Sequence, residues 1–275
     1  MAEFLTGKIG ADFRVRAISG VLAALVAAIC IGVGGWLSAL FIAFAAAVAA
    51  WEIRNIAYGA QKGDLATGVY LVGFFVAALV AHFMGGKVAV LVLALLTIVA
   101  AVADKRRGRD PFWGLIGAAT AGLATTSFVL LRDDPEFGLA TAVWLVLVVA
   151  ATDIGGYFAG RLIGGPKLAP ALSPKKTWAG LLGGMFLAFT VGAVFSGATT
   201  GTYVGEVGLL SVAAALVSQC GDLTESAFKR KFNVKDSGTL IPGHGGILDR
   251  ADGHMAATLV AAATVAMRGE GIFVW

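Results

Sequence analysis

Two pairs of carboxylates with the same spacing stand near the C-terminal end of the sequence. The pairs are Asp222 with Glu225 and Asp249 with Asp252. Residues three or four positions apart share one face of a helix, which also brings Ser226 beside the first pair. Acidic groups beside apolar runs are rare in membrane proteins unless they are paired or bind a metal. If these two helix ends meet, their carboxylates could bind a hard cation such as Mg²⁺, together with substrate phosphates and water.

Basic residues and a glycine-rich turn fill the segment between the two pairs. Lysine and arginine suit phosphate groups, and arginine can hold a phosphate through two parallel hydrogen bonds. The turn at 242–246 encloses His244 between glycines, whose backbone N–H groups can approach an anion closely. The basic run alone fits a solvated loop better, but with the acids, the histidine and the turn the segment is interpreted as a site. The basic residues are Lys229, Arg230, Lys231 and Lys235.

An earlier polar segment, residues 153–178, could form a second wall of this site. Asp153 stands at the end of an apolar run, eight residues before Arg161. We expect Ser173 to cap the next helix, with proline at its first position. A helix N-terminus flanked by two lysines and two hydroxyl groups can bind an anion. An ordinary helix cap accounts for the segment equally well. The hydroxyl and basic residues concerned are Ser173, Lys175, Lys176 and Thr177.

Membrane-spanning helices must position these groups. The chain has 275 residues, of which 58% are hydrophobic and 14% charged, and its mean hydropathy is +0.85. A helical span needs about 20 apolar residues. We therefore predict an all-α integral membrane protein with about nine transmembrane helices. The uncharged windows are 17–34, 35–51, 65–84, 88–103, 111–131, 137–152, 178–198, 207–221 and 253–267.

The distribution of basic residues predicts the orientation of these helices. With a cytoplasmic N-terminus and the C-terminus outside, all but three of the 21 lysines and arginines face the cytoplasm, as the positive-inside rule requires. The three exceptions are Lys87, Arg132 and Arg268. We expect one polytopic domain over residues 1–275, in which 1–150 is mainly scaffold and 151–260 is a catalytic region on the cytoplasmic side.

The sequence lacks the motifs that are typical of several other kinds of site. The chain contains no phosphate-binding loop of the G-x-x-x-x-G-K-[ST] type and no G-x-G-x-x-G fingerprint. It also lacks a G-x-S-x-G nucleophile elbow and an H-E-x-x-H zinc motif. No basic surface interleaved with aromatic residues predicts nucleic-acid binding. Its two cysteines stand in apolar runs and predict neither a metal site nor a disulfide framework.

The segment from Ser226 to Asp252 resembles the signature of the phosphatidate cytidylyltransferase (CDP-diacylglycerol synthase) family. The resemblance follows the pattern S-x-F-K-R-x(4)-K-D-x-G-x(2)-I-P-x-H-G-G-I-x-D-R-x-D, and the D-x-G-G-Y-F-A-G-R and S-P-K-K-T-W blocks at 153–178 resemble the same family. It implies a bacterial inner-membrane enzyme, and the distribution of basic residues predicts that its site faces the cytoplasm. Such an enzyme condenses CTP with phosphatidate in phospholipid biosynthesis, uses Mg²⁺ and forms a homodimer.

The resemblance also implies roles for individual residues. Asp222 and Asp249 correspond to the metal-binding acids of the family. Its polar active-site signature corresponds to Ser226, Lys229, Arg230, Lys235, Asp236, His244, Arg250 and Asp252. Two alternatives remain open: a CTP-dependent kinase of a lipid alcohol such as polyprenol or phytol, and a non-enzymatic lipid transporter. A transporter would spread polar residues through the middle of several spans, whereas here they gather at the inner ends.

Overall fold

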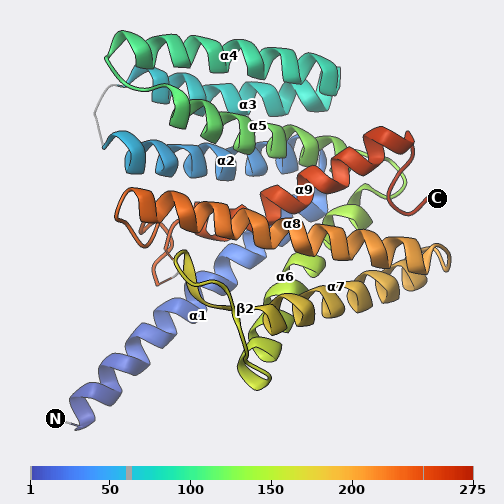
Figure 1. Cartoon of the computed structure of the whole chain (residues 1–275). Helices are drawn as coiled ribbons and strands as arrows, with labels where there is room; N and C mark the ends of the chain where they lie inside the picture. The colour runs from blue at the N-terminus through green and yellow to red at the C-terminus, as the bar shows by residue number, and fades with distance from the viewer. Residues whose placement is uncertain (1, 60–63, 244, 275) are drawn as a thin grey trace.

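The computed structural model describes residues 2–59, 64–243 and 245–274, with side chains described from Arg14 onward. This part of the chain forms nine helices and one short two-stranded sheet (Figure 1). The helices are α1 (Ala2–Val33), α2 (Gly35–Tyr58), α3 (Leu65–Met84), α4 (Gly86–Arg106), α5 (Phe112–Arg132), α6 (Gly138–Leu162), α7 (Trp178–Thr199), α8 (Val204–Lys231) and α9 (Leu248–Arg268). The strands are β1 (Lys167–Ala169) and β2 (Ser173–Thr177).

The helices confirm the predicted all-α membrane architecture. Among the described residues, eight helices are long and apolar enough to cross a membrane, so the chain is a multi-pass membrane protein. The ninth helix, α9, is not in that set; its first turns carry Asp249, Arg250 and Asp252. The long apolar stretch near the N-terminus divides at Gly34, whose φ of 77° ends α1 and begins α2.

The helices form two packed groups that meet along α9. Helices α2 to α5 lie together in the upper part of Figure 1, and α6 to α8 lie below them. α9 packs against α8 and α6 on one side and against α5 and α2 on the other. α1 contacts mainly α2, and nearly all its described side chains remain half-buried or exposed. An element from the first half of the chain can therefore reach the segment that precedes α9.

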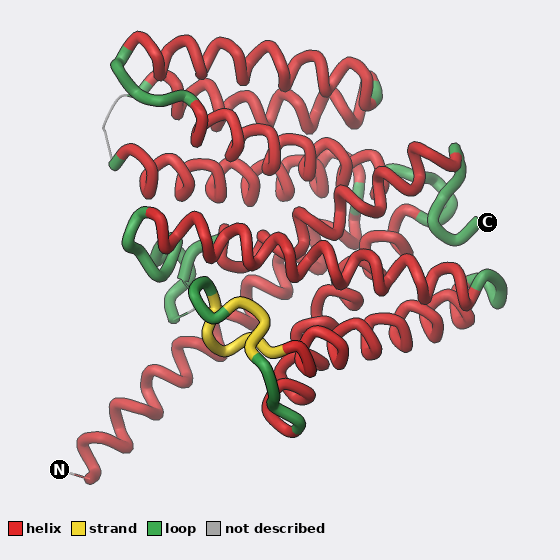
Figure 2. Tube along the Cα trace, viewed as in Figure 1, coloured by secondary structure: helices red, strands yellow, loops and turns green. Residues whose placement is uncertain are grey.

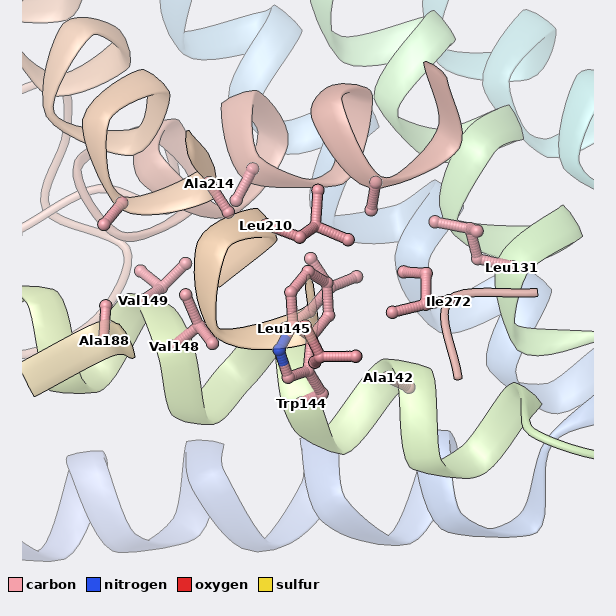
Figure 3. Packing of buried hydrophobic residues seen from close by; sticks show 14 of the residues in the cluster. Leu131, Ala142, Trp144, Leu145, Val148, Val149, Ala188, Leu210, Ala214 and Ile272 are labelled. Carbon is pink, nitrogen blue, oxygen red and sulfur yellow. The ribbon is translucent and has the colours of Figure 1, made fainter. Parts of the chain in front are cut away.

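The largest buried cluster joins α6 to α8 and α9. Trp144 is fully buried and donates a hydrogen bond from its indole nitrogen to Ser211 Oγ at 2.9 Å. Leu145 and Val148 of α6 lie among the same buried side chains as Leu210 and Ala214 of α8 (Figure 3). This packing fixes the position of α6 relative to α8. The C-terminal part of each helix carries polar residues, among them Asp153 in α6 and Asp222 in α8.

Glycines allow α6 and α7 to approach each other closely. A Cβ atom at Gly155 would lie 2.6 Å from the carbonyl oxygen of Gly183. Such small-residue contacts are typical of helix pairs in membranes, where backbone proximity supplies much of the packing. The close approach brings Asp153 and Arg161 of α6 beside the N-terminal end of α7.

The segment before α7 is a hairpin, so the predicted cap at Ser173 is wrong. Ser173 pairs with Ala169, and Thr177 pairs with Lys167, in an antiparallel arrangement. α7 therefore begins at Trp178, and Thr177 is its N-cap, accepting a hydrogen bond from Gly180 N at 3.0 Å. Thr177 supplies the same type of cap oxygen four residues later, because strand pairing keeps the intervening residues extended. Figure 2 shows this hairpin in yellow, directly before the start of α7.

A buried ionic cluster lies at the end of the α2–α5 group where α2 and α4 finish and α3 begins. Arg54 contacts Asp104 at 2.7 Å and Asp64 at 2.9 Å, and Arg109 contacts Asp64 at 2.7 Å. Burial alone would raise the pKa of Asp64, but hydrogen bonds from Thr67, Arg54 and Arg109 outweigh it and hold that pKa well below its ordinary value. The cluster ties the starts of α3 and α5 to the last turns of α2 and α4.

Candidate active site

A cavity of about 580 Å³ lies between α6, α8 and α9 at the end that carries the α8–α9 loop. Carboxylates dominate its walls, because six acidic side chains line it against one lysine and one arginine. We call it the acidic cavity. Its charged lining residues are Asp153, Asp222, Glu225, Lys229, Asp236, Asp249, Arg250 and Asp252.

Three carboxylates of the acidic cavity converge on one point. One oxygen from each of Asp222, Glu225 and Asp252 lies within 4.8 Å of the others. Burial raises the pKa of Asp252 to about 7, a hydrogen bond from Gly253 N opposes the shift, and the negative charge of Asp222 reinforces it. Oε1 of Glu225 is buried and has no hydrogen-bond partner among the described residues. Carboxylates this close repel one another unless a proton or a cation lies between them.

Asp249 belongs to the same wall but already has several donors. It accepts hydrogen bonds from Lys229 Nζ at 2.7 Å, Gly246 N at 2.9 Å and Ser237 N at 3.0 Å. Burial would raise the pKa of Asp249, but these partners, with Lys229 foremost, hold it well below its ordinary value. Asp249 is thus an ionised carboxylate held in place by the loop that precedes it.

Lys229 links the two predicted carboxylate pairs. Its Nζ lies 2.7 Å from Glu225 Oε2 on the same helix and 2.7 Å from Asp249 Oδ1 on α9. The ammonium group is largely buried, so removal of either carboxylate would leave a costly unbalanced charge in the interior. The predicted meeting of the two helix ends is confirmed, and a lysine forms the contact.

A second cavity of about 360 Å³ adjoins the first between α6, α7 and the hairpin. Three basic side chains line it against two acids, and we call it the basic cavity. The two cavities share Asp153, Gln219 and Asp222. At this common wall Lys176 Nζ lies 2.5 Å from Asp222 Oδ2. The polar and charged residues of the basic cavity are Thr152, Asp153, Tyr157, Arg161, Lys175, Lys176, Thr177, Gln219 and Asp222.

Four of the remaining predicted site residues, all described, lie outside the two linings. Ser226 Oγ is 3.4 Å from Asp222 Oδ1 and lies next to the acidic cavity. Arg230 points to the end of α8, where it donates to the Val234 carbonyl at 3.1 Å. Lys235 is exposed on the following loop, and Ser173 is half-buried in β2. His244 lies outside the described residues.

Sequence reasoning missed a buried acid of α2 that reaches the α8–α9 loop. Glu52 accepts hydrogen bonds from Leu248 N at 2.7 Å, Ile247 N at 3.1 Å and Ser237 Oγ at 3.1 Å. In the sequence, Glu52 stands beside Arg54 at the end of an apolar run, where charged residues ordinarily mark the membrane boundary. Only the tertiary contact reveals its partners. Gln219 and His254 also line the acidic cavity without a sequence signal.

The residues of the acidic cavity fit a divalent cation. Three converging carboxylates and a buried carboxylate oxygen without a donor supply the hard oxygen ligands that Mg²⁺ prefers. Asp222 is about one-third exposed, which leaves room for water or substrate oxygens beside it. Asp249 adds a further ionised carboxylate on the same wall.

A helical bundle of membrane-spanning length, with paired charged cavities at one end, defines a membrane-embedded protein with a polar site for charged ligands. A model of the cytidylyltransferase family matches residues 14–267. The chain therefore belongs to the cytidylyltransferase family.

Curated relatives carry one common name. The phosphatidate cytidylyltransferase of Brucella melitensis is 49% identical over 145 residues, a match that covers 53% of this chain and 54% of the relative. The chain thus spans about half the length of that relative. The proteins of the same name from Bacillus subtilis and Pseudomonas aeruginosa are 31% and 37% identical over 255 and 245 residues. These two matches cover 88% and 85% of this chain and 93% and 89% of the relatives.

Proposed function

We propose that this protein transfers the cytidylyl group of CTP to phosphatidate, which yields CDP-diacylglycerol and pyrophosphate. One observation carries the proposal: a carboxylate-rich cavity and a lysine- and arginine-rich cavity share a wall at Asp222. Such an arrangement suits a reaction between two phosphate-bearing substrates, one of them bound with a metal ion. The shared name of these relatives, phosphatidate cytidylyltransferase, suggests the specific pair of substrates.

The charge of the acidic cavity supports a role for Mg²⁺. A nucleoside triphosphate would meet six carboxylates there and be repelled unless cations intervened. We propose that Asp222 and Asp249 hold Mg²⁺, with Glu225 and Asp252 close to the same ion. When bound, the ion would neutralise phosphate charge and orient the triphosphate. Lys229 would keep Asp249 ionised and correctly turned for this role.

The basic cavity is our proposed site for the phosphate of phosphatidate. Arg161, Lys175 and Lys176 line it and can pair with a phosphate monoester. Exposed apolar side chains of α6 and α7 continue from this region, among them Phe158 at 56% and Leu182 at 62% exposure. In a membrane these surfaces face lipid, so acyl chains could lie along them while the head group enters the cavity.

The proposed chemistry needs positioning more than proton transfer. A phosphate oxygen of phosphatidate forms a bond to the α-phosphorus of CTP. The bond from that phosphorus to the α–β bridging oxygen breaks, and pyrophosphate leaves with the electron pair. The attacking phosphate is already largely ionised near neutral pH, so no strong general base is required. Lysine and arginine side chains at the two cavities would stabilise charge on the transferred and leaving groups.

Residues outside the two linings have supporting roles in this proposal. Arg230, exposed in the last turn of α8, and Lys235, exposed on the following loop, would attract CTP toward the site, because long-range attraction between opposite charges raises the local concentration of a ligand. Ser226 would orient Asp222 through its hydroxyl group. We propose that His244 shapes the glycine turn or donates a hydrogen bond and does not act as a base.

The proposed setting is a bacterial inner membrane, with the site facing the cytoplasm, where CTP is available. The distribution of basic residues supports this orientation. We further propose that the protein acts as a homodimer, as the family resemblance implies. Crosslinking in native membranes tests the dimer, and labelling of a cysteine introduced at Lys235 with a membrane-impermeant reagent tests the orientation.

A turnover assay tests the reaction. The purified protein, in detergent micelles with CTP and phosphatidate, is expected to form CDP-diacylglycerol and pyrophosphate only when Mg²⁺ is present. Formation of a lipid phosphate and CDP from a polyprenol or phytol would instead identify a lipid-alcohol kinase. Absence of any CTP turnover with either lipid class would contradict the enzymatic proposal and favour a transporter.

A further inference from the structure

A carboxylate from the scaffold half of the chain lies under the loop that builds the acidic cavity. Glu52 belongs to α2, and its side chain is 1% exposed. Its three hydrogen-bond donors come from the two ends of one segment, Ser237 at the start and Ile247 with Leu248 at the finish. The side chain therefore closes this segment into a loop from outside the α8–α9 pair.

The same segment also donates hydrogen bonds to Asp249, through other N–H groups than those that bind Glu52. Ser237 gives its hydroxyl to Glu52 and its backbone N–H to Asp249. Gly246 gives its N–H to Asp249, and the next residue, Ile247, gives its N–H to Glu52. The hydrogen-bond donors of this loop are thus shared between two carboxylates, Glu52 and Asp249. Of the two, Asp249 lines the acidic cavity. Displacement of Glu52 would remove the support on which the position of Asp249 depends.

The N-terminus of α9 explains why this support must come from another helix. Ile247 is the N-cap residue of α9, and its side chain cannot accept a hydrogen bond from the first turn. Glu52 accepts from Ile247 N and Leu248 N instead, so α9 is capped by α2. A carboxylate is also favoured at the positive end of a helix dipole.

The space around Glu52 is closed by glycines. A Cβ atom at Gly238 would lie 2.5 Å from Glu52 Oε1, and one at Gly246 would lie 2.5 and 2.6 Å from its two oxygens. The loop can therefore wrap the carboxylate only with glycine at these two positions. This enclosure leaves both oxygens facing N–H and O–H donors, and an amide side chain would turn its own NH₂ group toward one of them.

We propose that Glu52 is a positioning residue for the nucleotidyl transfer, because it holds Ser237, Ile247 and Leu248 in the arrangement that turns Asp249 into the acidic cavity. The expected effect of Glu52 on kcat rests on the proposed function. Its expected effect on the conformation of the loop before α9 does not. Residues that orient the ligands of a metal typically change metal affinity or activity by about 10- to 100-fold when they are replaced.

The test compares Glu52→Gln with Glu206→Gln, which changes an exposed glutamate in the first turn of α8. Glu52→Gln is expected to lower kcat by about tenfold or more and to raise the Mg²⁺ concentration for half-maximal rate by about tenfold. KM for phosphatidate should change little, because the basic cavity lies beyond Asp222. Glu206→Gln should match the wild type in all three quantities.

Hydrogen–deuterium exchange of the apo proteins supplies a readout that does not depend on turnover. The backbone amides of 237–248 should exchange faster in Glu52→Gln, whereas those of α6 and α7 should not change. Unchanged exchange in that segment, or normal kcat and Mg²⁺ dependence, would overturn the proposal. If the wild type itself shows no CTP turnover while exchange changes as expected, the function fails and the positioning role stands.

A milder variant serves if Glu52→Gln does not fold. Ser237→Ala removes one donor at 3.1 Å and leaves the two N–H donors of Ile247 and Leu248 in place. It should lower kcat by a smaller factor, about threefold, and raise the Mg²⁺ requirement in the same direction. An unchanged Mg²⁺ requirement in folded Ser237→Ala would overturn the proposal.

Discussion

Lys176 Nζ lies 2.5 Å from Asp222 Oδ2 and joins the hairpin before α7 to the polar end of α8. The pair stands at the wall common to both cavities, so a ligand in either one would lie beside it. An ammonium group placed between two phosphate-bearing substrates would reduce their mutual repulsion. Asp222 in turn keeps that ammonium group from turning away toward solvent.

Replacement of Lys176 should therefore impair the reaction more than a charge loss elsewhere on the hairpin. We expect Lys176→Met to reduce kcat/KM for phosphatidate by about 100-fold, since it removes a cation from the point where charge develops. Steady-state kinetics in detergent micelles with varied phosphatidate measure the effect. Lys167→Met is the matched control, because Lys167 is exposed on β1 and lines neither cavity. Equal effects of the two substitutions would contradict the role of Lys176.

Loss of a proposed metal ligand should abolish turnover without loss of the fold. Asp222→Asn and Asp249→Asn should each lower kcat by about 100-fold or more, and a chelator should do the same to the wild type. Activity should return to the wild type when Mg²⁺ is restored. Circular dichroism and gel filtration check that the variants insert and fold. Near-normal formation of CDP-diacylglycerol by purified Asp249→Asn would refute its assignment as a ligand.

The ionic cluster around Arg54 should contribute to stability. Arg54→Met leaves Asp104 buried without its principal cation and should destabilise the fold by about 3–5 kcal/mol. Thermal unfolding in detergent measures the loss as a lower Tm. Arg106→Met, at an exposed position in the last turn of α4, should leave Tm almost unchanged. A Tm for Arg54→Met within error of the wild type would show that the cluster adds nothing.

Acid should weaken the same cluster through Asp64. Its pKa is depressed in the folded state, so its contribution to stability is complete above the unfolded value of about 3.9 and is lost as pH falls through the folded pKa. We expect the Tm of the wild type to exceed that of Asp64→Asn by a constant amount from neutral pH down to about 5. The difference should shrink as pH falls below about 4. A difference that widens on acidification would reverse the assigned sign.

Much of the fold follows from the length of uncharged runs. A run of about 20 apolar residues must form its backbone hydrogen bonds internally in lipid, which leaves a helix as its structure. The break at Gly34 follows from a glycine-rich stretch within a run too long for one crossing. The hairpin of β1 and β2 was not predicted, because proline after a serine is typical of a helix start and the short segment 167–169, with which 173–177 pairs, carries no strand pattern of its own.

The site was predictable where its residues are close in sequence. The i, i+3 spacing of Asp222 with Glu225 and of Asp249 with Asp252 brought all four to one cavity wall. Glu52 could not be found in this way, since its partners lie in a loop that a different part of the chain supplies. Long-range contacts of this kind depend on how the two helix groups pack around α9.

The fate of the phosphorus atoms of CTP tests the central claim most directly. The protein is incubated with phosphatidate, Mg²⁺ and CTP labelled either at the α- or at the γ-phosphorus, and the lipid and aqueous products are separated. Our account predicts that the α label enters the lipid and the γ label leaves as pyrophosphate. Transfer of the γ label to lipid, with the α label retained in soluble CDP, would contradict it.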